Sequence, residues 1–140
     1  MPQPSLDLIR RVPLFAAADD RFLEGLAGEF MERTFSAGET IVEEGESGQT
    51  FIVIEDGWVT VTVHGQEVGR LGPGDAFGEM ALIDKSARTA TVTADINVHA
   101  YLLPVWSFRP LVESHPEMVW ALLETVAQRV RDAETRAGFS

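Results

Sequence analysis

The sequence predicts a mainly β domain, a double-stranded β-helix or jelly-roll-like barrel, with helices at both ends. Its 140 residues, 45% of them hydrophobic, suit one domain that buries a core without metals or disulfides. Nine of the twelve glycines lie between Gly38 and Gly78, and short alternating apolar runs fill the same stretch. We therefore expect a single domain over 1–140, with N-terminal helices over 5–30, a β-roll over 33–103 and C-terminal helices over 104–137.

The N-terminal part is expected to be helical. A short turn over Leu6–Arg10 leads through Val12-Pro-Leu-Phe15 to a second helix, which Asp19 and Asp20 can cap. The apolar residues of this second helix are spaced at helical intervals: Phe22, Leu23, Leu26, Ala27 and Phe30.

The central part is expected to form about eight short strands. Its clearest strand-like runs are Thr50–Ile54, Trp58–Val63, Glu67–Leu71, Thr89–Ala94 and Asn97–Leu103. Turn signals separate the first runs, at Glu55-Asp-Gly, His64-Gly and Leu71-Gly-Pro-Gly-Asp. Short strands at such regular spacing are typical of an all-β sandwich or barrel.

Two helices are expected after the β-roll. The first helix covers Pro104–Glu113. Pro116 suits the first position of the second helix, because a backbone N–H at that position has no partner within the helix and proline therefore loses no hydrogen bond there. The second helix carries one apolar stripe with Leu123 beside it: Val119, Leu122, Val126, Val130 and Ala133. We expect this stripe to pack on the mouth of the barrel or to form a weak homodimer. Three arginines toward the end of the helix suit its dipole: Arg129, Arg131 and Arg136.

Charge and composition exclude several functions. The net charge of −11 opposes binding to phosphate backbones, so we expect no direct nucleic-acid binding by this chain. Cysteine is absent, which excludes thiolate zinc sites and cysteine nucleophiles. No apolar run approaches a membrane span, and the first residues do not resemble a signal peptide, so a cytoplasmic location is expected.

The stretch Phe77–Val92 carries the features of an anion site. Arg70, Lys85 and Arg88 are the only lysine or arginine residues between positions 34 and 103, and small residues flank Arg88. Gly78 permits close backbone approach, and a helical turn over Glu79–Ile83 would present free amides. Amides and a planar guanidinium suit a phosphate, and a carboxylate suits a neighbouring sugar hydroxyl. The structural alternative is an ion pair of Arg88 with Asp84 or Glu79.

This stretch closely resembles the phosphate-binding cassette of cyclic nucleotide-binding domains. These domains occur in catabolite activator proteins, protein kinase A regulatory subunits and cyclic-nucleotide-gated channels. Further matches are found at Leu71–Phe77, Ala37–Ile41, Glu44–Glu46 and Val12–Phe15, and the resemblance extends from about residue 6 to 136.

The resemblance implies a β-roll that binds cAMP or cGMP, with the last helix near the base. The residues that it assigns to the ligand are Gly78, Glu79, Met80, Ala81, Arg88, Thr89 and Ala90. Gly78 and the amides of Met80 and Ala81 would line the phosphate. The Glu79 carboxylate would accept a hydrogen bond from the ribose 2′-hydroxyl. Arg88 and Thr89 would bind the phosphate oxygens. The family often has proline where this chain has Ala87, and Thr89 leaves the choice of base open.

No catalytic or metal-binding constellation is expected. His64, His99 and His115 occur singly, whereas a metal-binding cupin would need paired histidines, and no Gly-x-Ser-x-Gly, P-loop or His-Glu-x-x-His motif is present. We therefore predict a ligand-sensing regulatory domain, not an enzyme, with no metal and no cofactor besides the cyclic nucleotide. Its output would go through the terminal helices to an effector domain or protein.

Two alternatives remain open at the level of the sequence. The chain could be the sensing part of a catabolite-activator-type transcription regulator, whose DNA-binding region would follow Ser140. It could also be a degenerate domain that serves dimerisation without a ligand, although the pair of Glu79 and Arg88 argues against this.

Overall fold

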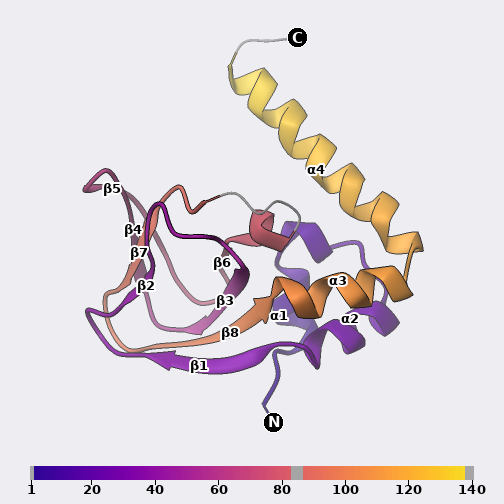
Figure 1. Ribbon diagram of the computed structural model, residues 1–140, viewed down its shortest axis with the longest axis horizontal. Helices are drawn as coiled ribbons and strands as arrows, with labels where there is room; N and C mark the ends of the chain where they lie inside the picture. Colours follow the sequence, from indigo (N-terminus) through magenta and orange to yellow (C-terminus); the bar gives the residue numbers. More distant parts are fainter. Residues whose placement is uncertain (1, 83–86, 138–140) are drawn as a thin grey trace.

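The computed structural model describes residues 2–82 and 87–137 of the chain (Figure 1). The helical segments are α1 (Leu6–Arg10), η1 (Pro13–Phe15), α2 (Asp20–Ala27), η2 (Glu79–Leu82), α3 (Val105–Ser114) and α4 (Glu117–Arg136). The strands are β1 (Met31–Phe35), β2 (Thr40–Val42), β3 (Thr50–Asp56), β4 (Val59–Val63), β5 (Gln66–Leu71), β6 (Ala76–Phe77), β7 (Thr91–Ala94) and β8 (Val98–Pro104).

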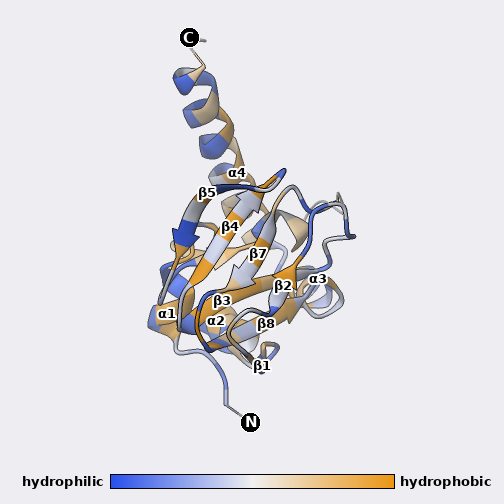
Figure 2. Cartoon of the chain, turned by 90° about the vertical axis from the view of Figure 1, so that its left-hand side faces the viewer, coloured by the Kyte–Doolittle hydropathy of each residue, from blue (hydrophilic) through white to orange (hydrophobic). Residues whose placement is uncertain are grey.

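The eight strands of the described chain form two four-stranded sheets. Their strand orders are β1-β8-β3-β6 and β2-β7-β4-β5, and every pairing is antiparallel. In Figure 2 the second sheet lies toward the viewer, with the first sheet behind it. The predicted mainly β fold with flanking helices is therefore confirmed.

Strand β3 is buried on both faces and so connects two hydrophobic cores. Ile52 and Ile54 belong to the core between the sheets, whereas Phe51 and Val53 belong to the core beneath the helices. Successive strand side chains point to opposite faces, so this assignment follows directly from the continuous apolar run of β3. The first sheet is thus covered by the second sheet on one side and by helices on the other.

The N-terminal helices begin where their caps predict. The Asp19 carboxylate accepts a hydrogen bond from the Phe22 amide at 2.8 Å, which starts α2. Ser5 caps α1 in the same way, through the Leu8 amide at 3.1 Å. The apolar face of α2 then packs fully into the helical core. Helix α2 ends at Ala27, so Phe30, which was predicted within it, lies beyond the helix but is buried in the same core.

Helix α4 contacts the body from its start as far as Arg129. It begins at Glu117, with Pro116 as its N-cap and not as the predicted first residue, and it runs away from the rest of the molecule (Figure 1). Met118 and Leu122 are buried, but Val119 is 40% and Val130 52% exposed, so the predicted stripe is only partly covered within this chain. A helix of 20 residues is about 30 Å long.

Candidate functional site

Arg88 is held in place by its own backbone just before β7. Its amide donates to the Glu46 carbonyl at 2.8 Å, and its carbonyl accepts from the Gly45 amide at 3.0 Å. Its guanidinium Nη2 donates to the Thr50 carbonyl at 2.6 Å. Partial burial lowers the pKa of the Arg88 guanidinium, and the Glu46 carboxylate opposes this shift. Because an arginine titrates far above neutral pH, Arg88 remains a fixed positive charge.

Gly78 lets this guanidinium lie directly against the backbone. The glycine has a φ of +82°, in the left-handed region. A Cβ atom at this position would collide with Nη1 of Arg88 and would lie 3.0 Å from the Thr50 carbonyl oxygen. Only glycine combines this backbone angle with the space that Arg88 needs.

A pocket of about 400 Å³, which we call the β5 pocket, lies beside the Arg88 guanidinium. Its lining is Val42, Val61, Val68, Gly69, Arg70, Leu71, Phe77, Gly78, Arg88, Thr89, Ala90 and Val92. Most of these side chains are apolar, and the few polar ones include the guanidinium. A pocket of this size and chemistry suits a small ligand with an apolar body and an anionic group.

Four of the seven predicted ligand residues line the β5 pocket, namely Gly78, Arg88, Thr89 and Ala90. Ala81 is buried, and its amide donates to the Gly78 carbonyl at 3.0 Å within the turn of η2. In this structure the turn itself therefore uses the Ala81 amide, which the family resemblance assigns to the phosphate. The side chain of Met80 lies outside the described part of the chain.

The Glu79 carboxylate, which is predicted to face the ribose of the ligand, instead contacts helix α4. It forms an ion pair with Arg129 of α4, and the Glu79 side chain is 20% exposed. It lines a separate pocket of about 340 Å³, together with Arg11, Asp75 and Arg129 among others. Glu79 therefore pairs with Arg129, not with Arg88. The other partner proposed for Arg88, Asp84, lies outside the described residues.

Arg129 contacts the candidate site although it is not among the predicted ligand residues. The sequence predicts only that Arg129 suits the dipole of the last helix, because nothing in the sequence links it to Glu79, 50 positions earlier. The sequence offers one signal for a contact between Arg129 and the site, namely that this arginine lies on a helix expected near the ligand. The ion pair connects α4 directly to the turn that begins at Gly78.

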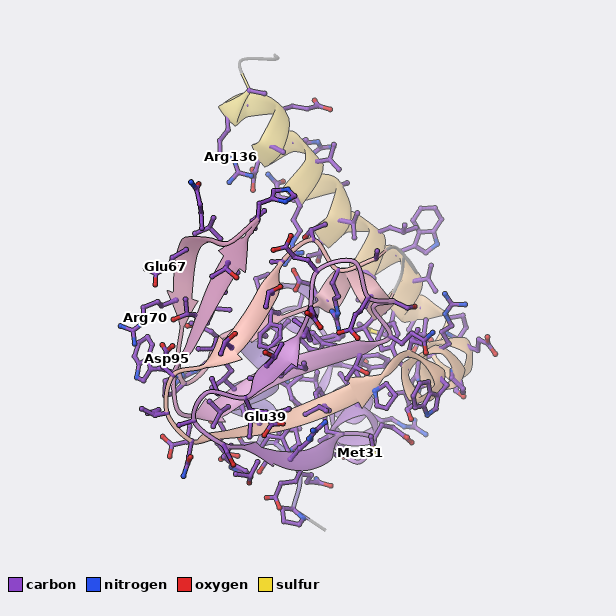
Figure 3. The ribbon with its side chains drawn as sticks, turned by 60° about the vertical axis from the view of Figure 1, so that its left-hand side comes forward. Met31, Glu39, Glu67, Arg70, Asp95 and Arg136 are labelled. Atoms are coloured by element: carbon purple, nitrogen blue, oxygen red, sulfur yellow. The ribbon has the colours of Figure 1, made fainter. Side chains whose placement is uncertain are left out.

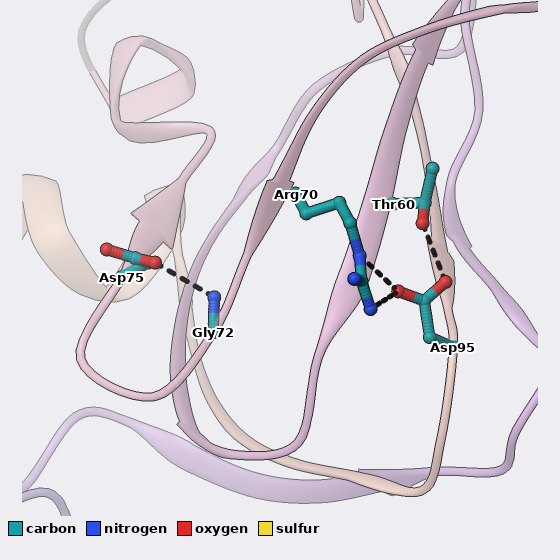
Figure 4. A network of polar contacts seen from close by, with 5 residues as sticks. All are labelled: Thr60, Arg70, Gly72, Asp75 and Asp95. Atoms are coloured by element: carbon teal, nitrogen blue, oxygen red, sulfur yellow. Dashed lines mark hydrogen bonds and ion pairs between the residues drawn. The ribbon is translucent and has the colours of Figure 1, made fainter.

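Arg70 is engaged on the outer surface of the second sheet. Figure 3 shows Arg70 and Asp95 close together there, and Figure 4 shows their contacts in detail. Arg70 donates to the Asp95 carboxylate at 3.1 and 2.9 Å, and the Thr60 hydroxyl donates to it at 2.7 Å. The hydrogen bond from Thr60 is the largest cause that lowers the pKa of the Asp95 carboxyl. Burial raises this pKa by less, and the hydrogen bond and charge of Arg70 lower it further. In the same figure Asp75 accepts a hydrogen bond from the Gly72 amide at 2.8 Å and closes the turn before β6.

The described residues show no group of three or more histidine, cysteine, aspartate or glutamate side chains that could hold a metal. His99 lies 2.7 Å from the Glu32 carboxylate and 3.5 Å from that of Glu55. The His115 Nδ1 lies 3.1 Å from the Leu111 carbonyl. Among the helices of the described chain, none is long and apolar enough to cross a membrane.

Comparison with known proteins identifies the family. The sequence profile of the family described as "Cyclic nucleotide-binding domain" matches residues 32–115. The chain belongs to the cyclic nucleotide-binding domain family. The domain is 36% identical over 120 residues to the potassium/sodium hyperpolarization-activated cyclic nucleotide-gated channel 4 of Homo sapiens. This match covers 86% of the domain and 10% of the channel. Channel 2 of Mus musculus matches at the same identity, and this match covers 14% of the channel. The domain therefore spans a small part of the length of these relatives.

Solved structures confirm the fold of the domain. The crystal structure of the N-terminal domain of a transcriptional regulator from Streptomyces coelicolor A3(2) matches with a TM-score of 0.85 and 34% identity, over 96% of this chain and 98% of that one. The catabolite activator protein of Thermus thermophilus matches with a TM-score of 0.74 and 26% identity, over 90% of this chain and 62% of that one.

Proposed function

We propose that the domain binds a cyclic mononucleotide, cAMP or cGMP, in the β5 pocket, with Arg88 on the phosphate. The observation that carries the proposal is the half-buried guanidinium held between the Thr50 carbonyl and Gly78 at the end of an apolar pocket. Such a fixed cation gives a chain of net charge −11 a local position that attracts an anion, and a phosphate is an anion of this kind.

The donor count of Arg88 supports a phosphate. A guanidinium has five N–H donors, and the hydrogen bond to Thr50 uses one of them. Two parallel donors match two oxygens of a phosphate, and such charge-assisted hydrogen bonds are the strong ones. The apolar walls from Val42, Val61 and Leu71 suit the sugar ring and base of the same ligand.

The ribose is the link from ligand to helix in this proposal. The Glu79 carboxylate would accept a hydrogen bond from the 2′-hydroxyl, but in this structure it pairs with Arg129. Binding would therefore exchange the Arg129 contact for a contact with the sugar. A ligand that binds the two arrangements differently shifts the population of α4 positions. We propose that this shift is the signal that the domain transmits.

We further propose that the domain is the sensing part of a larger regulatory protein. Its matches include the N-terminal domain of a transcriptional regulator over almost the whole length of both chains. They also include gated ion channels, of which the domain would form only a small part. Both kinds of relative support a regulatory role.

Isothermal titration of the wild-type domain tests the proposal. The ligands are cAMP, cGMP and cyclic di-GMP, with 5′-AMP as the non-cyclic control. We expect saturable binding of at least one cyclic mononucleotide and much weaker binding of 5′-AMP. If none of the four ligands gives heat or raises the melting temperature, the proposal is wrong and the domain is a non-binding member of its family.

A further inference from the structure

The side chain of Glu44 connects two segments on either side of the start of β7, and we propose that it is a positioning residue for Arg88. Glu44 follows β2, whereas His64 lies in the turn between β4 and β5. In the second sheet, β7 lies between β2 and β4 (Figure 2). The Glu44 side chain therefore reaches across the end of β7 at Thr91, three residues after Arg88.

The Glu44 carboxylate caps the turn of the β4–β5 hairpin. One oxygen accepts a hydrogen bond from the His64 amide at 2.9 Å, a contact that we call the Glu44 brace, and the other oxygen lies 3.7 Å from the His64 Nδ1. His64 has a φ of +52° and Gly65 one of +80°, so both residues of the turn are in the left-handed region. This conformation is unfavourable for histidine, and the brace helps to hold it. The Glu44 side chain is only 26% exposed, so water screens the brace in part.

The backbone that carries the Glu44 side chain also holds Arg88. The Glu44 amide donates a hydrogen bond to the Thr91 hydroxyl at 3.1 Å. The next two residues bond to Arg88 itself: the Gly45 amide donates to the Arg88 carbonyl at 3.0 Å, and the Arg88 amide donates to the Glu46 carbonyl at 2.8 Å. The Glu44 brace thus ties the hairpin turn to the segment that fixes the Arg88 backbone.

Arg88 and the β4–β5 hairpin line the same β5 pocket, so the role of Glu44 rests on the proposed function. Val61 and Val68 lie on the two strands of the hairpin and line the pocket together with Arg88. A ligand that contacts both parts binds more tightly when they are already held in place, because less freedom is lost on binding. Loss of the Glu44 brace should therefore weaken nucleotide binding although Arg88 itself is unchanged.

The charge of Glu44 has the opposite expected effect on affinity, which separates the brace from simple electrostatics. An acidic side chain in this loop repels a phosphate, so removal of the charge alone should tighten nucleotide binding. Removal of the brace should weaken it. Glu43→Ala is the matched control, because Glu43 is the neighbouring residue, carries the same charge and is exposed.

Isothermal titration of the preferred cyclic nucleotide compares the variants. We expect a Kd about three- to tenfold higher for Glu44→Ala, which loses one partly exposed hydrogen bond. Glu44→Gln keeps a side-chain oxygen for the His64 amide and should bind within about twofold of wild type. Glu43→Ala should bind at least as tightly as wild type, and so should Gly65→Ala, because a Cβ there meets nothing within 4 Å and leaves the brace intact. Wild-type or tighter binding by Glu44→Ala, or an equal loss in Glu44→Gln, would overturn the proposal.

Amide hydrogen exchange of the nucleotide-free domain tests the brace independently of any ligand. In Glu44→Ala the His64 amide loses its acceptor and exchanges faster in any case. If Glu44 positions Arg88, the Gly45 and Arg88 amides should also exchange at least about tenfold faster, while the amides of α2 keep their wild-type rates. Faster exchange confined to His64 would show that Glu44 only caps the turn, and the proposal would be wrong. A wild type that binds no cyclic nucleotide would refute the proposed function alone, and the exchange rates would still decide the role of Glu44.

Discussion

Substitution of Gly78 by alanine tests the contact between the backbone and the Arg88 guanidinium. The added Cβ would collide with Nη1 of Arg88 and crowd the Thr50 carbonyl, and the φ of +82° would become strained. The left-handed backbone costs an L-residue about 1–2 kcal/mol. Displacing the guanidinium also gives up its hydrogen bond to Thr50, worth about 1.5–3 kcal/mol for a charged group.

The matched control is Gly65→Ala. Gly65 has a φ of +80°, and a Cβ there meets nothing within 4 Å, so this variant carries the backbone strain alone. We expect chemical denaturation to show a loss of about 1–2 kcal/mol for Gly65→Ala, with unchanged nucleotide affinity. Gly78→Ala should lose up to about 3 kcal/mol more.

Nucleotide affinity distinguishes the two variants most clearly. The end of an arginine side chain can move away from the new Cβ, but it then leaves its position beside the β5 pocket. We expect isothermal titration to show a Kd at least tenfold higher for Gly78→Ala, which corresponds to about 1.4 kcal/mol. The reasoning is refuted if Gly78→Ala binds within twofold of wild type, or if Gly65→Ala loses as much affinity.

Three further predictions concern the neighbouring polar groups. Wild type should bind cAMP more tightly than 2′-deoxy-cAMP, and Glu79→Ala should lose most of this difference; equal discrimination by both proteins would remove Glu79 from the ribose site. Arg129→Gln should raise nucleotide affinity about two- to fivefold, because a partly exposed ion pair is worth at most about 1 kcal/mol, whereas Arg131→Gln should change nothing; lower affinity in Arg129→Gln would show that the arginine binds the ligand itself. Asp95→Asn should destabilise the domain at pH 7 by less than about 1 kcal/mol. Since the pKa of Asp95 is lower in the folded than in the unfolded chain, its contribution is complete above the unfolded pKa and is lost as the pH falls through the folded one. Melting curves of both proteins from pH 7 to pH 3 should therefore converge, and a constant gap between them would contradict this assignment.

The helices and long strands could be predicted because their signals are local. Asp19 caps α2 and an apolar periodicity follows it, and the run of β3 is continuous. Other strands carry weaker signals. β1 reads Met-Glu-Arg-Thr-Phe and buries only Phe35, and β6 has two residues, so pairing with neighbouring strands defines them more than their own sequence does.

The sequence indicates several of the residues that line the β5 pocket, but it does not indicate which side chains pair with one another. The Gly78–Glu79 and Arg88–Thr89 pairs are visible as motifs, and three of these four residues line one pocket. The pairing of Glu79 with Arg129 depends on where α4 lies relative to η2, which periodicity does not specify. The same limit applies to the stripe of α4, because an apolar pattern identifies the face of a helix but not how far its partner extends.

Titration of cAMP and cGMP into Arg88→Ala tests the central claim most directly. Arg33→Ala is the control, because Arg33 is an arginine of the same sandwich that does not line the β5 pocket. The account predicts that Arg88→Ala, shown by circular dichroism to be folded, binds the preferred nucleotide at least tenfold more weakly than wild type and Arg33→Ala. Wild-type affinity in a folded Arg88→Ala would contradict it and place the phosphate elsewhere.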